Sequence, residues 1–245
     1  MPVPRGGAGP YARPMDVILI PGFWLTGASW DPVVPALESA GHRVRALTLP
    51  GKGDAPGDPT RIGLADHVAA VVAEVDASEG RVVLVGHSGG GAIAHAAADA
   101  RPDRVARVVY VDSVPLGDGA AINDELPVVD GVIPLPDWSV FGDEDLVDLD
   151  DALRDRLRAM SVPEPARVAS DTQVLHDARR YDVPITLITC EFPATAIRDL
   201  MNANHWYTAE LARVKDATLV DLLTGHWPQV TRPAELATAL VAAIR

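Results

Sequence analysis

The segment 86–90, GHSGG, places Ser88 between glycines that stand two positions away on each side. A nucleophile on a very tight turn from a strand to a helix crowds its neighbours, so small residues at this spacing suit the chemistry. An apolar run at 81–86 precedes the turn and an Ala-rich stretch follows it. We therefore predict that Ser88 is a catalytic nucleophile at a helix N-terminus, where free N–H groups favour developing negative charge. A Gly-rich turn of purely structural use is the alternative.

A serine nucleophile needs a general base, and seven histidines compete for that role. His226 lies in the segment 224–228, TGHWP, between the last predicted strand and the last predicted helix. This position puts it at the same edge of the sheet as Ser88, so we favour His226 over a surface-loop role for it. His87 adjoins Ser88, but successive side chains diverge in such a turn. His205 stays open as an alternative, and the remaining candidates lie in helices, in an irregular segment or at the opposite end of the sheet: His42, His67, His95 and His176.

Apolar runs typical of buried strands alternate along the chain with Ala-rich stretches typical of helices. This alternation indicates βαβ units, so we predict an α/β fold with a mostly parallel, doubly wound sheet. Loops after the strands should then meet at the carboxyl edge of the sheet, where such folds bind ligands. The predicted strands are 16–21, 43–49, 81–86, 105–111, 185–189 and 217–222, with helices at 64–76, 90–100 and 233–244.

The alternation breaks between residues 115 and 180, where loop-like Pro and Gly occur and an acidic helical stretch spans about 143–160. We expect a single α/β domain over residues 15–245, with residues 115–180 as a small cap insertion over one end of the sheet. Residues 1–14 are expected to be a loosely held Gly/Pro-rich leader. The acidic stretch is more typical of a solvated helix face than of a cation site, so no metal is expected.

The composition of the chain disfavours some classes of binding partner. The chain has 21 Lys and Arg against 34 Asp and Glu, a net charge of −13, which repels the phosphate backbone of nucleic acids. The single cysteine, Cys190, excludes an internal disulfide and a cysteine-based zinc site. No apolar run approaches the roughly 20 residues of a membrane span, and the first fourteen residues lack the core of a signal peptide. We expect a cytoplasmic protein with a small-molecule substrate and no cofactor, nucleic acid or membrane partner; the oligomeric state is not predicted.

Together these motifs resemble the α/β-hydrolase fold superfamily, in particular its small Ser-acid-His members, which include esterases, lactonases and hydroxynitrile lyases. The resemblance runs from about Met15 to the C-terminus, and its anchors are the segment 21–24 (PGFW), the turn at Ser88 and Gly225-His226. It implies that the backbone N–H groups of Phe23 and Gly89 form an oxyanion hole. Family members commonly carry His-Gly where this chain has Pro-Gly, but backbone donors do not depend on that side chain. The family's first two strands have no clear equivalent here, which predicts a sheet of about six strands.

The resemblance leaves two candidates for the triad acid. The acid usually follows the strand predicted at 185–189, where the nearest carboxylate is Glu191. A minority arrangement places it at the end of the strand after the nucleophile helix, where Asp112 stands. That strand should neighbour the nucleophile strand, so we favour Asp112 and keep Glu191 as the alternative. Their other interpretations are a turn-capping aspartate and a solvated loop acid.

We predict a serine hydrolase that cleaves an ester, lactone or thioester through an acyl-enzyme on Ser88. The first alternative is a C–C bond hydrolase or hydroxynitrile-lyase-like enzyme with the same triad, and the second is a non-catalytic ligand-binding module. Trp24, Trp138 and Trp227 are candidate substrate-lining residues, with plain packing as the alternative.

Overall fold

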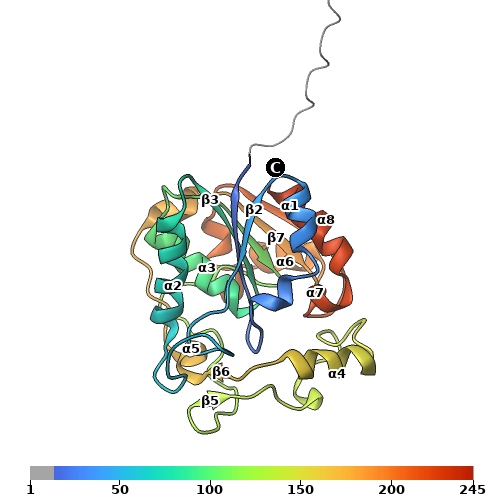
Figure 1. Ribbon diagram of the computed structural model, residues 1–245. Coiled ribbons are helices and arrows are strands. Elements are labelled where there is room, and N and C mark those ends of the chain that lie inside the picture. Colours follow the sequence, from blue (N-terminus) through green and yellow to red (C-terminus); the bar gives the residue numbers. More distant parts are fainter. Residues whose placement is uncertain (1–13, 245) are drawn as a thin grey trace, which may run out of the picture.

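A parallel sheet of six strands forms the centre of the computed structural model, which describes residues 14–244 (Figure 1). The strand order is β2-β1-β3-β4-β7-β8. The chain places β2 on one side of β1 and then adds β3, β4, β7 and β8 in turn on the other side. The predicted α/β fold and six-stranded sheet are confirmed, while the predicted leader lies almost entirely outside the described residues. The strands are β1 (Asp16–Ile20), β2 (Arg43–Ala46), β3 (Val82–His87), β4 (Val105–Val111), β7 (Ile185–Thr189) and β8 (Ala217–Asp221).

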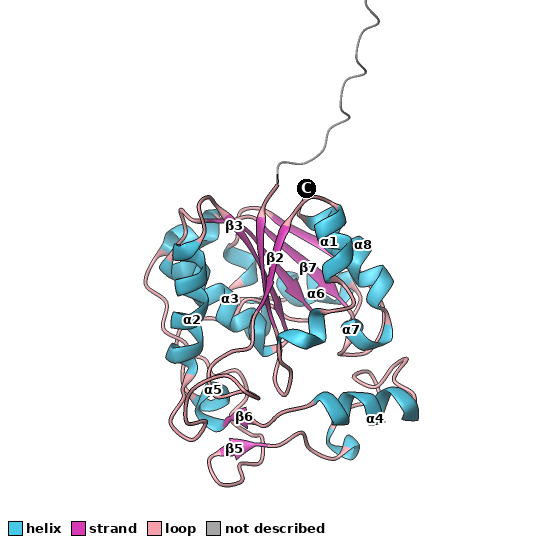
Figure 2. Ribbon diagram, in the orientation of Figure 1, coloured by secondary structure: helices cyan, strands magenta, loops and turns pink. Residues whose placement is uncertain are grey.

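Helices cover both faces of the sheet, as the doubly wound arrangement requires (Figure 2). Ile18 and Ile20 of β1 face one apolar core together with α2 and α3, whereas Val17 and Leu19 face the other core with α1 and α8. Because both faces are buried, the central strands are mostly apolar and do not alternate regularly between apolar and polar residues. The helices are α1 (Val34–Ser39), α2 (Leu64–Ala77), α3 (Gly89–Ala100), α6 (Ala194–Asn202), α7 (Pro228–Thr231) and α8 (Pro233–Ala243), with the 3₁₀ helices η1 (Gly27–Trp30), η4 (Trp206–Thr208) and η5 (Leu211–Arg213).

Most of the segment between β4 and β7, including β5, α4, β6 and α5, lies beyond the carboxyl ends of the sheet strands (Figure 1). Its last part packs against α3 and leads back to the start of β7. Its two short strands pair antiparallel with each other and not with the central sheet. The predicted acidic helix is shorter than expected and starts at Asp151, because the Asp150 side chain accepts a hydrogen bond from Leu153 N and ends the preceding loop. The elements of this segment are β5 (Val132–Ile133), η2 (Trp138–Val140), α4 (Asp151–Met160), β6 (Glu164–Pro165), α5 (Ala166–Ser170) and η3 (Ala178–Asp182).

Over residues 14–244, no helix has both the length and the apolar character needed to cross a membrane.

Candidate active site

Ser88 occupies the turn between β3 and α3 with φ 52° and ψ −128°, a backbone conformation that L residues rarely adopt. The two flanking glycines permit this turn. A Cβ on Gly86 would lie 2.4 Å from the carbonyl oxygen of Gly90, and a Cβ on Gly90 would lie 2.6 Å from the carbonyl oxygen of Ile20. Larger residues at these positions would push the helix away from the strands, so the glycine spacing has the steric reason inferred from the sequence.

His226 reaches Ser88 from the loop between β8 and α7, and its Nε2 lies 2.8 Å from Ser88 Oγ. The segment between β4 and β7 holds this loop. Gly225 N donates to the carbonyl oxygen of Val147 at 3.0 Å, and His226 N donates to that of Asp145 at 2.9 Å. A Cβ on Gly225 would lie only 2.3 Å from the latter oxygen, so glycine is needed for this close approach.

Both candidate acids reach the other ring nitrogen of His226. Asp112 Oδ2 lies 2.7 Å from His226 Nδ1, and Glu191 Oε1 lies 2.6 Å from the same atom. Nδ1 carries a single hydrogen, and the hydrogen-bond geometry directs it to Asp112, whereas Glu191 Oε1 has no hydrogen-bond partner among the described residues. The other oxygen of Asp112 accepts from the backbone N–H groups of Cys190, at 3.0 Å, and Glu191, at 3.2 Å. Asp112 is therefore the better held of the two carboxyl groups.

The two carboxyl groups differ in acidity. Burial raises the pKa of Glu191 to about 8 and outweighs the contact with His226, which lowers it; the negative charge of Asp112 adds to the rise. Burial also favours the neutral form of Asp112, but its hydrogen bonds outweigh burial and hold its pKa below the usual value. Burial likewise disfavours the imidazolium, yet the two carboxyl groups, each within 2.7 Å of Nδ1, raise the pKa of His226 to about 10. Asp112 is therefore the more acidic of the two carboxyl groups.

The two residues predicted to form the oxyanion hole lie on either side of a tight contact between the loop after β1 and the turn at Ser88. Phe23 follows β1, and Gly89 is the first residue of α3; neither N–H donates to an acceptor among the described residues. The loop after β1 packs tightly on the turn, because a Cβ on Gly22 would lie 2.9 Å from Ser88 Cβ. A Cβ on Gly89 would lie 2.7 Å from the Phe23 ring. Both donors therefore remain available for a ligand atom beside Ser88.

The three tryptophans named from the sequence gather in one aromatic cluster with Phe141. The Phe141 ring lies 5.8 Å from the Trp24 ring and 5.2 Å from the Trp227 ring, and Trp138 lies 6.0 Å from Trp227 between ring centroids. Trp24 and Trp227 are buried, whereas Trp138 and Phe141 are half-buried. The cluster joins the loop after β1, the segment between β4 and β7, and the His226 loop.

Sequence reasoning missed two buried charged residues beside the loop after β1. Lys52 and Glu164 are each 1% exposed, and Lys52 Nζ lies 2.7 Å from Glu164 Oε2. Lys52 lies in a Gly- and Pro-rich stretch, and the one available signal is that it is one of two lysines in the chain. Glu164 lies in the irregular segment 115–180 and carries no local signal.

A metal would find few ligands in the described part of the chain. Asp112, Glu191 and His226 form the only group of three His, Cys, Asp or Glu side chains with ligand atoms within 4.8 Å of one another across residues 14–244. His226 Nδ1 is already bonded to Asp112 in that group. We therefore assign these residues to the hydrogen-bond chain of Ser88 and not to a metal.

Comparison with known proteins identifies the family. A family model described as the alpha/beta hydrolase family matches residues 17–239. The chain belongs to the alpha/beta hydrolase family. It is 42% identical over 102 residues to a pyrethroid hydrolase of Sphingobium wenxiniae, a match that covers 40% of this chain and 36% of the relative's length. It is 29% identical over 245 residues to a carbendazim hydrolyzing esterase of a Nocardioides species, covering 93% of this chain and 98% of the relative.

Solved structures show the same fold. An extracellular alpha/beta-hydrolase from a Paenibacillus species superimposes with a TM-score of 0.75, covering 94% of this chain and 99% of the neighbour. Its sequence is 21% identical, so this likeness concerns the fold of the alpha/beta hydrolase and not its substrate.

Proposed function

We propose that this alpha/beta hydrolase is a serine ester hydrolase in which Ser88, His226 and Asp112 form the catalytic triad. The observation that carries the proposal is a continuous hydrogen-bond chain. Ser88 Oγ lies 2.8 Å from His226 Nε2, and His226 Nδ1 lies 2.7 Å from Asp112 Oδ2. This arrangement lets a histidine accept the serine proton while a carboxylate fixes its tautomer and stabilises its charged form.

The reaction then follows from the positions of these groups. Ser88 Oγ attacks the ester carbonyl carbon as His226 Nε2 takes its proton, and the carbonyl oxygen becomes an oxyanion. The N–H groups of Phe23 and Gly89 donate to that oxyanion, and removal of one such donor typically costs about 3 kcal/mol of transition-state stabilisation. His226 then protonates the departing alcohol, and a water molecule activated by the same histidine hydrolyses the acyl-enzyme.

The acid is assigned to Asp112 and not to Glu191 because of charge and hydrogen bonding. A general base needs an anionic partner at Nδ1. Asp112 fits that role better, because it accepts two backbone N–H groups as well as the Nδ1 hydrogen and its pKa is lowered, whereas burial raises the pKa of Glu191. Glu191 is the second carboxyl group at the same nitrogen. In a variant without the Asp112 carboxylate, an ionised Glu191 would accept the Nδ1 hydrogen.

The substrate is proposed to be a small carboxylic ester, lactone or thioester with an apolar or aromatic part. The support is the aromatic cluster of Trp24, Trp138, Trp227 and Phe141, together with relatives named as esterases or hydrolases. Residues 115–180 are proposed to act as a cap that selects the substrate, because they contribute Trp138 and Phe141 to this cluster. The cytoplasmic location stays a prediction.

An activity screen tests the proposal. p-Nitrophenyl esters of graded acyl length and a set of lactones are offered to the wild-type protein and to Ser88→Ala. Hydrolysis by the wild-type protein, with kcat lowered by several orders of magnitude in Ser88→Ala, is expected. A Ser88→Ala protein that keeps more than about a tenth of the wild-type kcat would exclude Ser88 as the nucleophile.

A further inference from the structure

A buried ion pair lies beside the proposed oxyanion hole. Lys52, in the loop after β2, and Glu164, on β6, are both 1% exposed, and their charged atoms are 2.7 Å apart. Removing two charges from water is unfavourable, and their mutual attraction repays this only with good geometry and further hydrogen bonds. The further hydrogen bonds of this pair go to a single short stretch of backbone.

That stretch is the loop after β1. Lys52 Nζ donates to the carbonyl oxygen of Gly22 at 2.9 Å. Glu164 Oε2 accepts from the backbone N–H of Trp24 at 3.2 Å. The two members of one ion pair therefore bind the backbone on both sides of Phe23.

The contact with Gly22 helps to fix the direction of the Phe23 N–H, together with the longer hydrogen bond from Leu25 N to the same carbonyl oxygen at 3.3 Å. The Gly22 carbonyl and the Phe23 N–H belong to the same peptide unit, which is planar and trans, so the two groups point in opposite directions. An ammonium group that holds the carbonyl oxygen on one side therefore aims the N–H to the other side. The positive charge also polarises the peptide and makes its N–H a stronger donor.

The next residue shows that the loop is held under strain. Trp24 has φ 61°, in the left-handed region that residues with a side chain seldom occupy. Such a conformation persists only where the surroundings over-determine it. Besides the bond to Glu164, Trp24 O accepts from Val162 N at 2.9 Å, and Trp24 Nε1 donates to Ile133 O at 3.1 Å. All three partners belong to the segment between β4 and β7.

We propose that Lys52 and Glu164 are positioning residues that aim the Phe23 N–H at the oxyanion, which makes the segment between β4 and β7 part of the catalytic site. This inference rests on the proposed function, because it takes Phe23 as an oxyanion donor. The competing explanation is that the ion pair only stabilises the fold.

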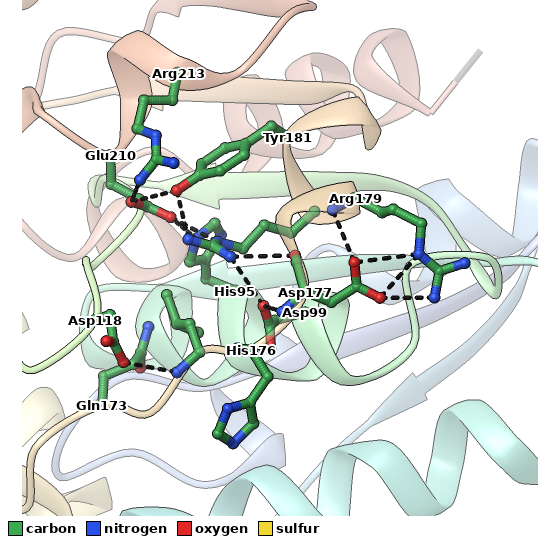
Figure 3. A network of polar contacts seen from close by, with 12 residues as sticks. His95, Asp99, Asp118, Gln173, His176, Asp177, Arg179, Tyr181, Glu210 and Arg213 are labelled. Atoms are coloured by element: carbon green, nitrogen blue, oxygen red, sulfur yellow. Dashed lines mark hydrogen bonds and ion pairs between the residues drawn. The ribbon is translucent and has the colours of Figure 1, made fainter.

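A second buried polar network offers a matched control. Glu210 accepts from Arg180 Nε at 2.7 Å and from Tyr181 OH at 3.1 Å, and its Oε1 lies 3.0 Å from His95 Nε2 (Figure 3). Arg180 and Glu210 are each 8% exposed, so this pair is almost as buried as the first. None of the contacts of Glu210 involves the loop after β1. Glu210→Gln therefore reports the loss of a buried charge pair without a change at the proposed oxyanion hole.

The test variant is the double substitution Lys52→Met and Glu164→Gln. It leaves no single charge buried, and the glutamine oxygen still offers an acceptor to the Trp24 N–H, but the Gly22 carbonyl loses its ammonium partner. Steady-state kinetics on a p-nitrophenyl ester are combined with inhibition by an alkyl trifluoromethyl ketone and by the matching methyl ketone. Ser88 Oγ adds to the carbonyl carbon of the trifluoromethyl ketone, and the resulting negative oxygen lies in the oxyanion hole. The methyl ketone does not form this adduct readily and resembles the ground state.

The double variant should have a kcat about tenfold to a hundredfold lower than the wild type, with KM changed less than about threefold. A misdirected N–H donor still stabilises the transition state in part, so the loss in kcat should be smaller than that for a missing donor. The affinity advantage of the trifluoromethyl ketone over the methyl ketone should shrink by the same factor. Glu210→Gln should unfold at a lower temperature but keep both kcat and that advantage. Lys52→Met alone removes the ammonium partner of the Gly22 carbonyl and should lose as much of both quantities, and it carries the test if the double variant does not fold.

A folded double variant, or folded Lys52→Met, with kcat and the ketone advantage within about twofold of the wild type would overturn the positioning role. Ser88→Ala separates this failure from a failure of the proposed function. If Ser88→Ala still hydrolyses the ester, the proposed function is wrong. If Ser88→Ala is inactive while the variants of the ion pair are unchanged, only the positioning role is wrong.

Discussion

Asp112→Asn probes how His226 is oriented. The asparagine oxygen can still accept the two backbone N–H groups of residues 190 and 191, which leaves its NH₂ group facing His226 Nδ1. The ring then carries its hydrogen on Nε2, where it faces Ser88 and cannot accept the serine proton. A fixed wrong tautomer of this kind lowers kcat by a factor on the order of 10⁴.

Glu191 changes the expected size of this loss. Its Oε1 lies 2.6 Å from His226 Nδ1, and the charge of Asp112 contributes to raising its pKa to about 8. Asp112→Asn removes that charge, so Glu191 ionises more readily and can accept the Nδ1 hydrogen in its place. We expect the single variant to be at least about tenfold more active than the double variant Asp112→Asn/Glu191→Gln, which should show the full loss on the order of 10⁴. Glu191→Gln alone should stay within about threefold of the wild type at its optimum pH, because Asp112 keeps its hydrogen bond to His226 Nδ1.

The assay is kcat on one p-nitrophenyl ester for the wild type, both single variants and the double variant, from about pH 6 to about pH 9. Equal activity of Asp112→Asn and the double variant would show that Glu191 does not substitute for Asp112. A loss of the order of 10⁴ in Glu191→Gln, with Asp112→Asn nearly silent, would move the triad acid to Glu191.

Three further predictions concern the pH profile, stability and substrate choice. His226 acts as a base only when neutral, and its carboxyl partners raise its pKa, so kcat/KM of the wild type should rise with a midpoint above pH 6.5, the usual pKa of histidine. In Glu191→Gln this midpoint should move to lower pH. A midpoint at 6.5 that is the same in both proteins would contradict this. Burial favours the neutral form of Glu210, but its hydrogen bonds lower its pKa from 4.5 to about 2, so its stabilisation is present above pH 4.5 and is lost as the pH falls toward 2. Glu210→Gln should therefore cost roughly 3 kcal/mol of unfolding free energy at neutral pH and almost nothing near pH 2, measured by urea titration, and a cost that does not change with pH would contradict this. Trp138→Ala should change KM and the preferred acyl length more than the melting temperature, whereas a large stability loss with unchanged kinetics would make Trp138 an ordinary packing residue.

Local patterns in the sequence were enough to predict the parts of the site that are local in the chain. The strands at 105–111 and 185–189 have the predicted bounds because segments rich in apolar and β-branched residues mark strands that are buried on both faces. Strand β2 ends three residues earlier than predicted, at Ala46, because its pairing with β1 stops at Leu19. The turn at Ser88 could be predicted from the sequence because the steric need for glycine falls at positions 86 and 90, two residues to each side of Ser88.

Contacts between segments that are distant in the chain could not be predicted from local patterns. The segment between β4 and β7 has no periodic pattern, so its hydrogen bonds to Trp24 and to the His226 loop could not be inferred. The choice between Asp112 and Glu191 stayed open because neighbouring strands β4 and β7 bring both carboxyl groups to one nitrogen. Burial and hydrogen bonding, which separate the two, depend on the folded surroundings and not on the local sequence.

The most direct test of the account is detection of the acyl-enzyme. The protein is mixed rapidly with a p-nitrophenyl ester that it hydrolyses, quenched with acid within the first turnover, and examined by intact mass and peptide mass spectrometry. The account predicts one acyl group per chain, located on Ser88, formed together with a burst of p-nitrophenol and absent from Ser88→Ala. Hydrolysis at the wild-type rate with no acyl group on Ser88 at any time, or with the acyl group on another residue, would contradict it.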